Sequence, residues 1–135
     1  MNNIVLKYYE TTKILKKVIK EKINDIPVYI FNDKNFTISN KNNNFLFIKI
    51  ESIDNFSYKE NKIYSGILVI NIYIIINKGN FNLLLDYSND LVLLFEKQNK
   101  IKNIKINKIV FDAYRGTNIE LGGNIFLNIL LKCED

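Results

Sequence analysis

Histidine is absent and cysteine occurs once in this chain of 135 residues, and many enzymes depend on these two residue types for catalysis. Without histidine, neither a Ser-His-Asp nor a Cys-His pair can form, and no imidazole is present to bind a metal. The single cysteine, Cys133, lies near the C-terminus on the apolar side of an alternating segment. We expect a buried structural thiol there, and one cysteine excludes a disulfide within the chain.

The carboxylates and glycines also lack the spacing of a reactive site. Acidic residues are scattered along the sequence instead of forming the cluster that an oxygen-ligated metal needs. Asp86 and Asp90 are one helical turn apart and could face a ligand, although a solvated pair is the simpler interpretation. None of the five glycines falls in the spacing of a phosphate-binding loop such as GxGxxG. We therefore expect a protein that is not an enzyme and that holds no cofactor and no metal.

The charge balance is basic, with a formal net charge of +5. Lysines supply nearly all of the positive charge, since Arg115 is the only arginine. One interpretation of the densest lysine stretch is a solvated helix face, and the other is a face that contacts phosphates. The scarcity of arginine, the side chain best suited to bidentate phosphate contacts, favours the first. The stretch comprises Lys13, Lys16, Lys17, Lys20 and Lys22.

Two segments have the apolar periodicity of helices that could position these groups. From Ile4 to Ile23, apolar residues recur every three or four positions, and Pro27 follows shortly after the pattern ends. A second helical pattern runs from Asn80 to Gln98, with Asn80 as a suitable N-cap residue. Most lysines of the first segment fall outside its apolar stripe, so we expect them on the solvent side.

The remaining apolar segments have the pattern of β-strands. They predict an α+β fold in one domain, residues 1–135, with the element order α-β-β-β-α-β-β and a mainly antiparallel sheet of about four to five strands. Both helices are expected on one face of that sheet. A polar loop over 32–44, containing Phe36 and Ile38, and a polar hairpin tip over 54–62 connect the early strands. The predicted strands are Val28 to Phe31, Phe45 to Ile53, Gly66 to Ile76, Ile104 to Tyr114 and Asn118 to Cys133, the last two joined by a turn at Arg115.

The predicted strand from Gly66 to Ile76 is apolar on both faces. It is too short to span a membrane, so no membrane association is expected. The helices would cover one face, and either a partner surface or the chain's own loops would cover the other. If a partner covers it, the subunit-interface candidates are Ile67, Val69, Tyr73 and Ile75.

The whole element order resembles that of the tail terminator, or tail completion, proteins of tailed bacteriophages. The resemblance rests on an N-terminal helix, a short strand at Pro27-Val28-Tyr29, two strands around a charged tip, a helix from Asn80 to Gln98 and a closing hairpin. It covers nearly the whole chain, and it rests on element order and length without any residue-level motif. The function that it implies is that of a structural virion protein.

The resemblance implies a homo-oligomer, a six-fold ring at the neck of the virion that is made in the cytoplasm of the host bacterium. Such a ring would end tail polymerisation and contact the tail tube protein on one side and the head connector or another neck protein on the other. DNA would pass through its lumen without specific binding. Loop residues expected to meet these partners are Asn35, Lys59, Glu60 and Arg115. The alternative function is a small monomeric nucleic-acid-binding module that uses the basic face of the first helix.

Overall fold

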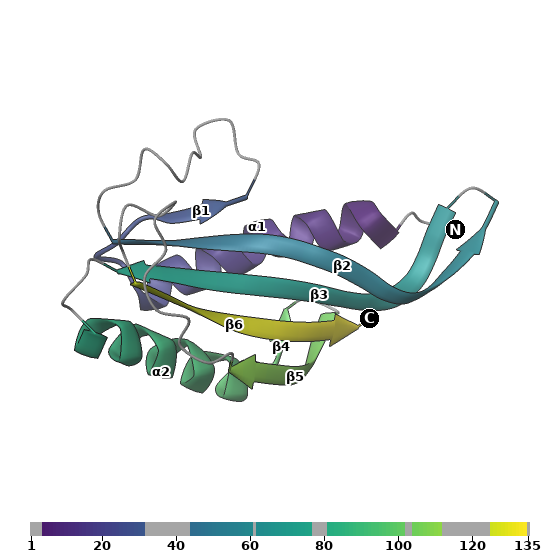
Figure 1. Cartoon of the computed structure of the whole chain (residues 1–135). Helices are drawn as coiled ribbons and strands as arrows, with labels where there is room; N and C mark the ends of the chain where they lie inside the picture. The colour runs from purple at the N-terminus through teal and green to yellow at the C-terminus, as the bar shows by residue number, and fades with distance from the viewer. Residues whose placement is uncertain are drawn as a thin grey trace.

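The structure is a computed structural model, and it describes residues 4–31, 44–60, 62–76, 81–101, 104–111 and 125–134. Within these ranges, two helices cover one face of a six-stranded sheet (Figure 1). The elements are α1 (Ile4–Lys22), β1 (Val28–Ile30), β2 (Phe45–Lys59), β3 (Lys62–Ile76), α2 (Phe81–Lys97), β4 (Lys100–Ile101), β5 (Ile104–Phe111) and β6 (Ile125–Glu134).

The predicted α+β fold with two helices on one face is confirmed. The strand order is β1-β2-β3-β6-β5-β4, and every described pairing is antiparallel except that of β1 with β2. The described sheet has one strand more than expected, because the two-residue β4 pairs with the start of β5. Two residues are too few to give a sequence pattern, so β4 was not predicted. The predicted turn at Arg115 and the loop over 32–43 lie outside the described residues.

Helix α1 forms where its apolar periodicity predicted it. Tyr8, Leu15 and Ile19 point into the core and are at most 1% exposed. The pattern ends with the backbone bond from Ile23 N to Ile19 O, 2.8 Å long, and the Asn24-Asp25 pair and Pro27 follow. Two lysines occupy the last turn, where the partial negative charge of the helix end favours cations.

The connection between β2 and β3 differs from the predicted polar tip over 54–62. Both strands continue through that segment, and Lys59 pairs directly with Lys62. Cross-strand backbone hydrogen bonds satisfy the peptide groups there, so the strands do not need apolar side chains to continue. Three register shifts between Ile50 and Tyr58 accompany the bend of the hairpin seen in Figure 1. Glu60, at the turn, adopts a left-handed backbone conformation with φ of 54°.

The main core lies between the sheet and the two helices. Alternate residues of β3 enter it, as expected for a strand whose side chains alternate between faces. Leu46 and Ile48 of β2 join them, and the opposite set, Phe45 and Phe47, faces away, which confirms the predicted alternation of this strand. The β3 residues in the main core are Leu68, Ile70, Ile72, Ile74 and Ile76.

Candidate interaction surfaces

The face of the sheet opposite the helices carries a second, aromatic cluster. Phe47 lies at its centre and stacks on Tyr73, with the ring centroids 4.5 Å apart and the planes 12° from parallel. Phe45 and Phe31 each lie 6.3 Å from the Phe47 ring, and Tyr29 contacts Phe45 edge-on at 6.0 Å. Such ring contacts add about 0.5–1.5 kcal/mol per pair beyond area burial. The cluster therefore fixes β1, β2 and β3 relative to one another on this face.

A polar network follows the aromatic cluster along the same face. The Glu51 carboxylate accepts hydrogen bonds at Oε1 from Asn71 Nδ2, at 2.9 Å, and from the Tyr73 hydroxyl, at 3.1 Å. Lys49 Nζ lies 3.8 Å from Glu51 Oε2 and 5.0 Å from the centroid of the Phe31 ring. Asn71, the polar interruption of the apolar β3 segment, is thus hydrogen-bonded on the second face and does not enter the main core.

The predicted subunit-interface residues differ in how much surface they offer. Val69 is 5% exposed and Ile75 is 1% exposed, so both are already covered within one chain. Ile67 and Tyr73 are half-buried, so part of each side chain remains exposed to solvent. This burial favours the alternative in which a single chain covers most of its second face. Contact of this face with a neighbouring copy stays a prediction.

The predicted partner-contact loops are described only around the hairpin turn. Glu60 is exposed there, and Lys59 is the last residue of β2. The hairpin extends beyond the end of β6, which pairs with β3 only as far as Leu68. The base of the hairpin is hydrogen-bonded to α1, because the hydroxyl of the buried Tyr8 donates a hydrogen bond of 2.6 Å to Gly66 O. Asn35 and Arg115 lie outside the described residues.

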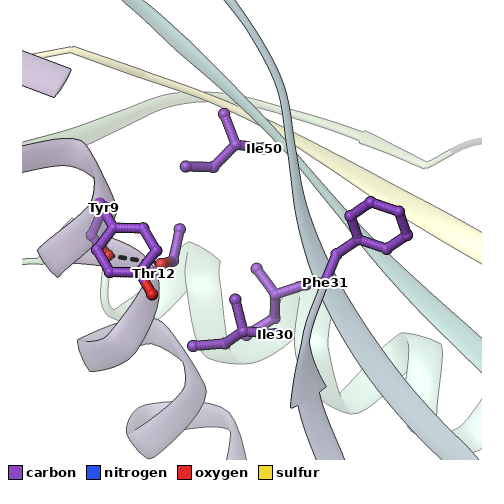
Figure 2. A pocket seen from close by; sticks show the side chains of 6 residues that line it. Tyr9, Thr12, Ile30, Phe31 and Ile50 are labelled. Carbon is purple, nitrogen blue, oxygen red and sulfur yellow. Dashed lines mark hydrogen bonds between the residues drawn. The ribbon is translucent and has the colours of Figure 1, made fainter. Parts of the chain in front are cut away.

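A small pocket separates the first half of α1 from the β1–β2 edge of the sheet (Figure 2). Its volume is about 120 Å³, below the roughly 300–1,000 Å³ of typical ligand sites. The Thr12 hydroxyl donates a hydrogen bond of 2.6 Å to the Tyr9 carbonyl, so its proton is already used within the helix. The wall is mostly apolar and comprises Tyr9, Thr12, Ile30, Phe31, Ile48 and Ile50.

The carboxylates form a tertiary contact that the sequence did not indicate. Asp25, in the α1–β1 connection, accepts a hydrogen bond of 2.6 Å from the Tyr87 hydroxyl of α2. Burial, the hydrogen bond to Asp25 and the negative charges of Asp25 and Asp90 together raise the pKa of Tyr87 to about 12. Asp86 is exposed and Asp90 is half-buried. The described residues contain no group of three or more His, Cys, Asp or Glu side chains arranged to hold a metal.

We expect Tyr87→Phe to lower the free energy of unfolding by about 1 kcal/mol at pH 8 in urea titrations. The loss is modest because water can solvate the exposed Asp25 once the hydroxyl is gone. The raised pKa of Tyr87 makes this contribution fully present below pH 10 and lost as the pH rises toward 12. The difference in free energy of unfolding between wild type and variant should therefore become smaller above pH 10. Tyr9→Phe, at an exposed tyrosine, is the matched control, and an equal loss there would contradict the assignment.

Cys133 is buried and free, as predicted. It lies on the helix-facing side of β6, in the same core as Leu131 and opposite Leu68 of β3. Burial raises the pKa of its thiol to about 12, so the nucleophilic thiolate is scarce at neutral pH. The residue therefore acts as a small apolar side chain in the core.

The outer surfaces of the two helices differ in charge and in apolar content. In α1, Lys13, Lys17 and Lys20 are exposed and Lys16 is half-buried, so these lysines lie on the solvent side of the helix as expected. In α2, Leu85 and Leu93 are 40% and 44% exposed, so both leave apolar surface in contact with water. Neither helix in the described part of the chain is long and apolar enough to cross a membrane.

Comparison with known proteins informs the fold alone. No protein-family model matches the chain, and no curated protein matches it significantly. Among the solved structures that resemble it, one aligns with 90% of this chain and 87% of its own, with a TM-score of 0.51. The two sequences are 13% identical, so the likeness extends to the arrangement of helices and strands and not to a shared activity.

Proposed function

We propose that this chain is a structural virion protein of the phage tail terminator type. In this role, copies of the chain form a ring at the head-proximal end of the tail tube and join the tube to the head connector. The observation that carries the proposal is the element order, in which a helix and a short strand precede a long hairpin and a second helix precedes the closing strands. That order is the one on which the resemblance to tail terminators rests.

The long β2–β3 hairpin supports this proposal in a specific way. Each of its strands has 15 residues, and the distal part projects past the end of β6 (Figure 1). The bond between Tyr8 and Gly66 ties its base to α1, so the hairpin is held at the body of the protein. A projecting hairpin with the exposed Glu60 at its turn is suited to contact the next ring along the tail axis.

The test is assembly of the purified protein, measured by native mass spectrometry and electron microscopy of negatively stained particles. We expect closed rings of six copies, and we expect these rings to bind one end of tail tubes from the same phage. The gene should lie beside genes for portal, tail-tube or tape-measure proteins. A chain that stays monomeric at all concentrations and never associates with tail tubes would refute the proposal.

The second candidate function, nucleic-acid binding by a monomer, is favoured by one observation: Lys17, Lys20 and Lys22 are all exposed on α1. This function requires affinity for DNA or RNA that falls steeply with salt, because each phosphate contact releases counterions. Replacing Lys16 and Lys17 by glutamate should then abolish binding in a filter or anisotropy assay. Unchanged binding by that variant would exclude α1 as the binding face.

A further inference from the structure

The two helices carry opposite net charge. Helix α1 contains six lysines and two glutamates, and α2 contains two aspartates and one glutamate against one lysine. Both helices pack on the same side of the sheet and also contact each other. Helix α1 lies mainly over β1, β2 and β3 and also contacts β4, whereas α2 lies over β3, β6 and β5 (Figure 1). Their outer surfaces therefore face solvent side by side and do not cover one another.

Each outer surface combines an exposed apolar side chain with charges of one predominant sign. On α2, the exposed Leu85 and Leu93 are about two turns apart and have carboxylates beside them. On α1, Tyr9 is 44% exposed, and Lys13 lies over its ring at 5.0 Å. We call Leu85, Asp86, Asn89, Leu93 and Glu96 the acidic α2 face, and Tyr9, Lys13, Lys17 and Lys20 the basic α1 face.

We propose that the acidic α2 face of one copy docks on the basic α1 face of the next copy. The occupant is a second copy of this chain because the surface of complementary charge is present on the chain itself. The pairing joins two different surfaces, so it is head-to-tail, and repetition of a head-to-tail contact closes into a ring when the rotation between copies permits. The inference rests on the proposed ring function and names the surfaces through which that ring forms.

The area of the two faces predicts how stable a single contact between two copies is. A stable interface buries about 800 Å² on each partner. A helix of 17 residues is about 25 Å long and, with its side chains, about 10 Å wide, so paired helices alone supply only part of that area. We therefore expect a weak single contact that becomes stable when ring closure gives every copy two contacts. The charges should make assembly weaken as salt rises.

Reversing the charge of one face at a time tests the pairing directly. One variant carries Lys17→Glu and Lys20→Glu, and the other carries Asp86→Lys and Glu96→Lys; all four residues are exposed, so the fold should be retained. Each variant alone should lose assembly in sedimentation velocity and native mass spectrometry, with at least a tenfold weaker apparent association. An equimolar mixture should assemble again, because each reversed face then meets its complement on the other variant.

Two further variants test whether the position of the charge change matters and whether the exposed leucines contribute to assembly. Lys105→Glu with Lys108→Glu makes the same charge change on exposed residues of β5 and should assemble like wild type. Leu85→Ser with Leu93→Ser should weaken assembly at unchanged urea stability. If wild type forms rings but the two charge-reversal variants also form them, or their mixture is not restored, the helix pairing is wrong and the ring function stands. If wild type forms no oligomer under any condition, both the pairing and the ring function fall.

Discussion

Replacing Phe47 by alanine is expected to lower the free energy of unfolding of a single chain by about 3–5 kcal/mol. Phe47 is 5% exposed and lies at the centre of the aromatic cluster on the second face of the sheet. Its removal would leave a cavity between the rings of Phe31, Phe45 and Tyr73. The loss is a large fraction of the 5–15 kcal/mol that typically separates folded from unfolded domains.

The measurement is urea unfolding at several protein concentrations, which separates two accounts of the second face. If one chain completes this face, the loss appears in full in the monomer and does not depend on concentration. If a neighbouring copy completes it, the monomer loses little, and the deficit appears only where oligomers form. Lys105→Ala, at an exposed residue of β5 outside both helix faces, is the control and should cost less than about 0.5 kcal/mol. A loss below about 1 kcal/mol for Phe47→Ala would contradict the burial described above.

Much of the fold could be predicted because it follows from local periodicity. The three- and four-residue spacing of Tyr8, Thr12, Leu15 and Ile19 specifies the buried side of α1. The alternation from Phe45 to Glu51 specifies both faces of β2. These patterns reflect side-chain directions that the backbone imposes on every helix and strand. The positions of Cys133 in the core and of the lysines on the solvent side of α1 follow from the same rule.

The features that were missed depend on contacts between distant residues or on the backbone alone. Tyr87 and Asp25 are 62 positions apart, and Asn71 and Glu51 are 20 positions apart, so no local spacing signals either bond. The hairpin continues through a polar segment because peptide groups pair across the strands whatever side chains they carry. The parallel pairing of β1 with β2 likewise joins separate segments, and no local spacing signals it.

The exposed apolar residues favour a contact between copies at the helices instead of at the second face of the sheet. From the sequence, the second face of β3 was the natural place for a partner, because it is apolar. In the structure, Val69 and Ile75 of that face are already covered, whereas Leu85 and Leu93 of α2 remain exposed. An apolar side chain can contribute to association only through area that the single chain leaves in contact with water. The helix layer therefore offers more apolar surface for assembly than those two positions on the sheet.

An exchange of polarity should cost far more stability at one residue of β3 than at its neighbour, because the two side chains point to different faces of the sheet. Ile72→Asn is expected to lower the free energy of unfolding by about 4 kcal/mol or more. Ile72 is fully buried in the main core, next to Ile48 across the strand pair. The substitution removes apolar contacts and also buries an amide without a partner, which costs about 1–3 kcal/mol by itself.

Asn71→Ile should cost less than about 1 kcal/mol, although Asn71 is also buried. The substitution would remove the hydrogen bond from Asn71 to Glu51. Glu51 is exposed to water, and it keeps its hydrogen bond from the Tyr73 hydroxyl and its ion pair with Lys49. Its carboxylate can therefore replace the lost bond with solvent, whereas the amide introduced at position 72 cannot. Urea unfolding of the two variants under one set of conditions measures the contrast. Equal losses would mean that the second face is as closed to water as the main core, and the distinction between the two faces would then be wrong.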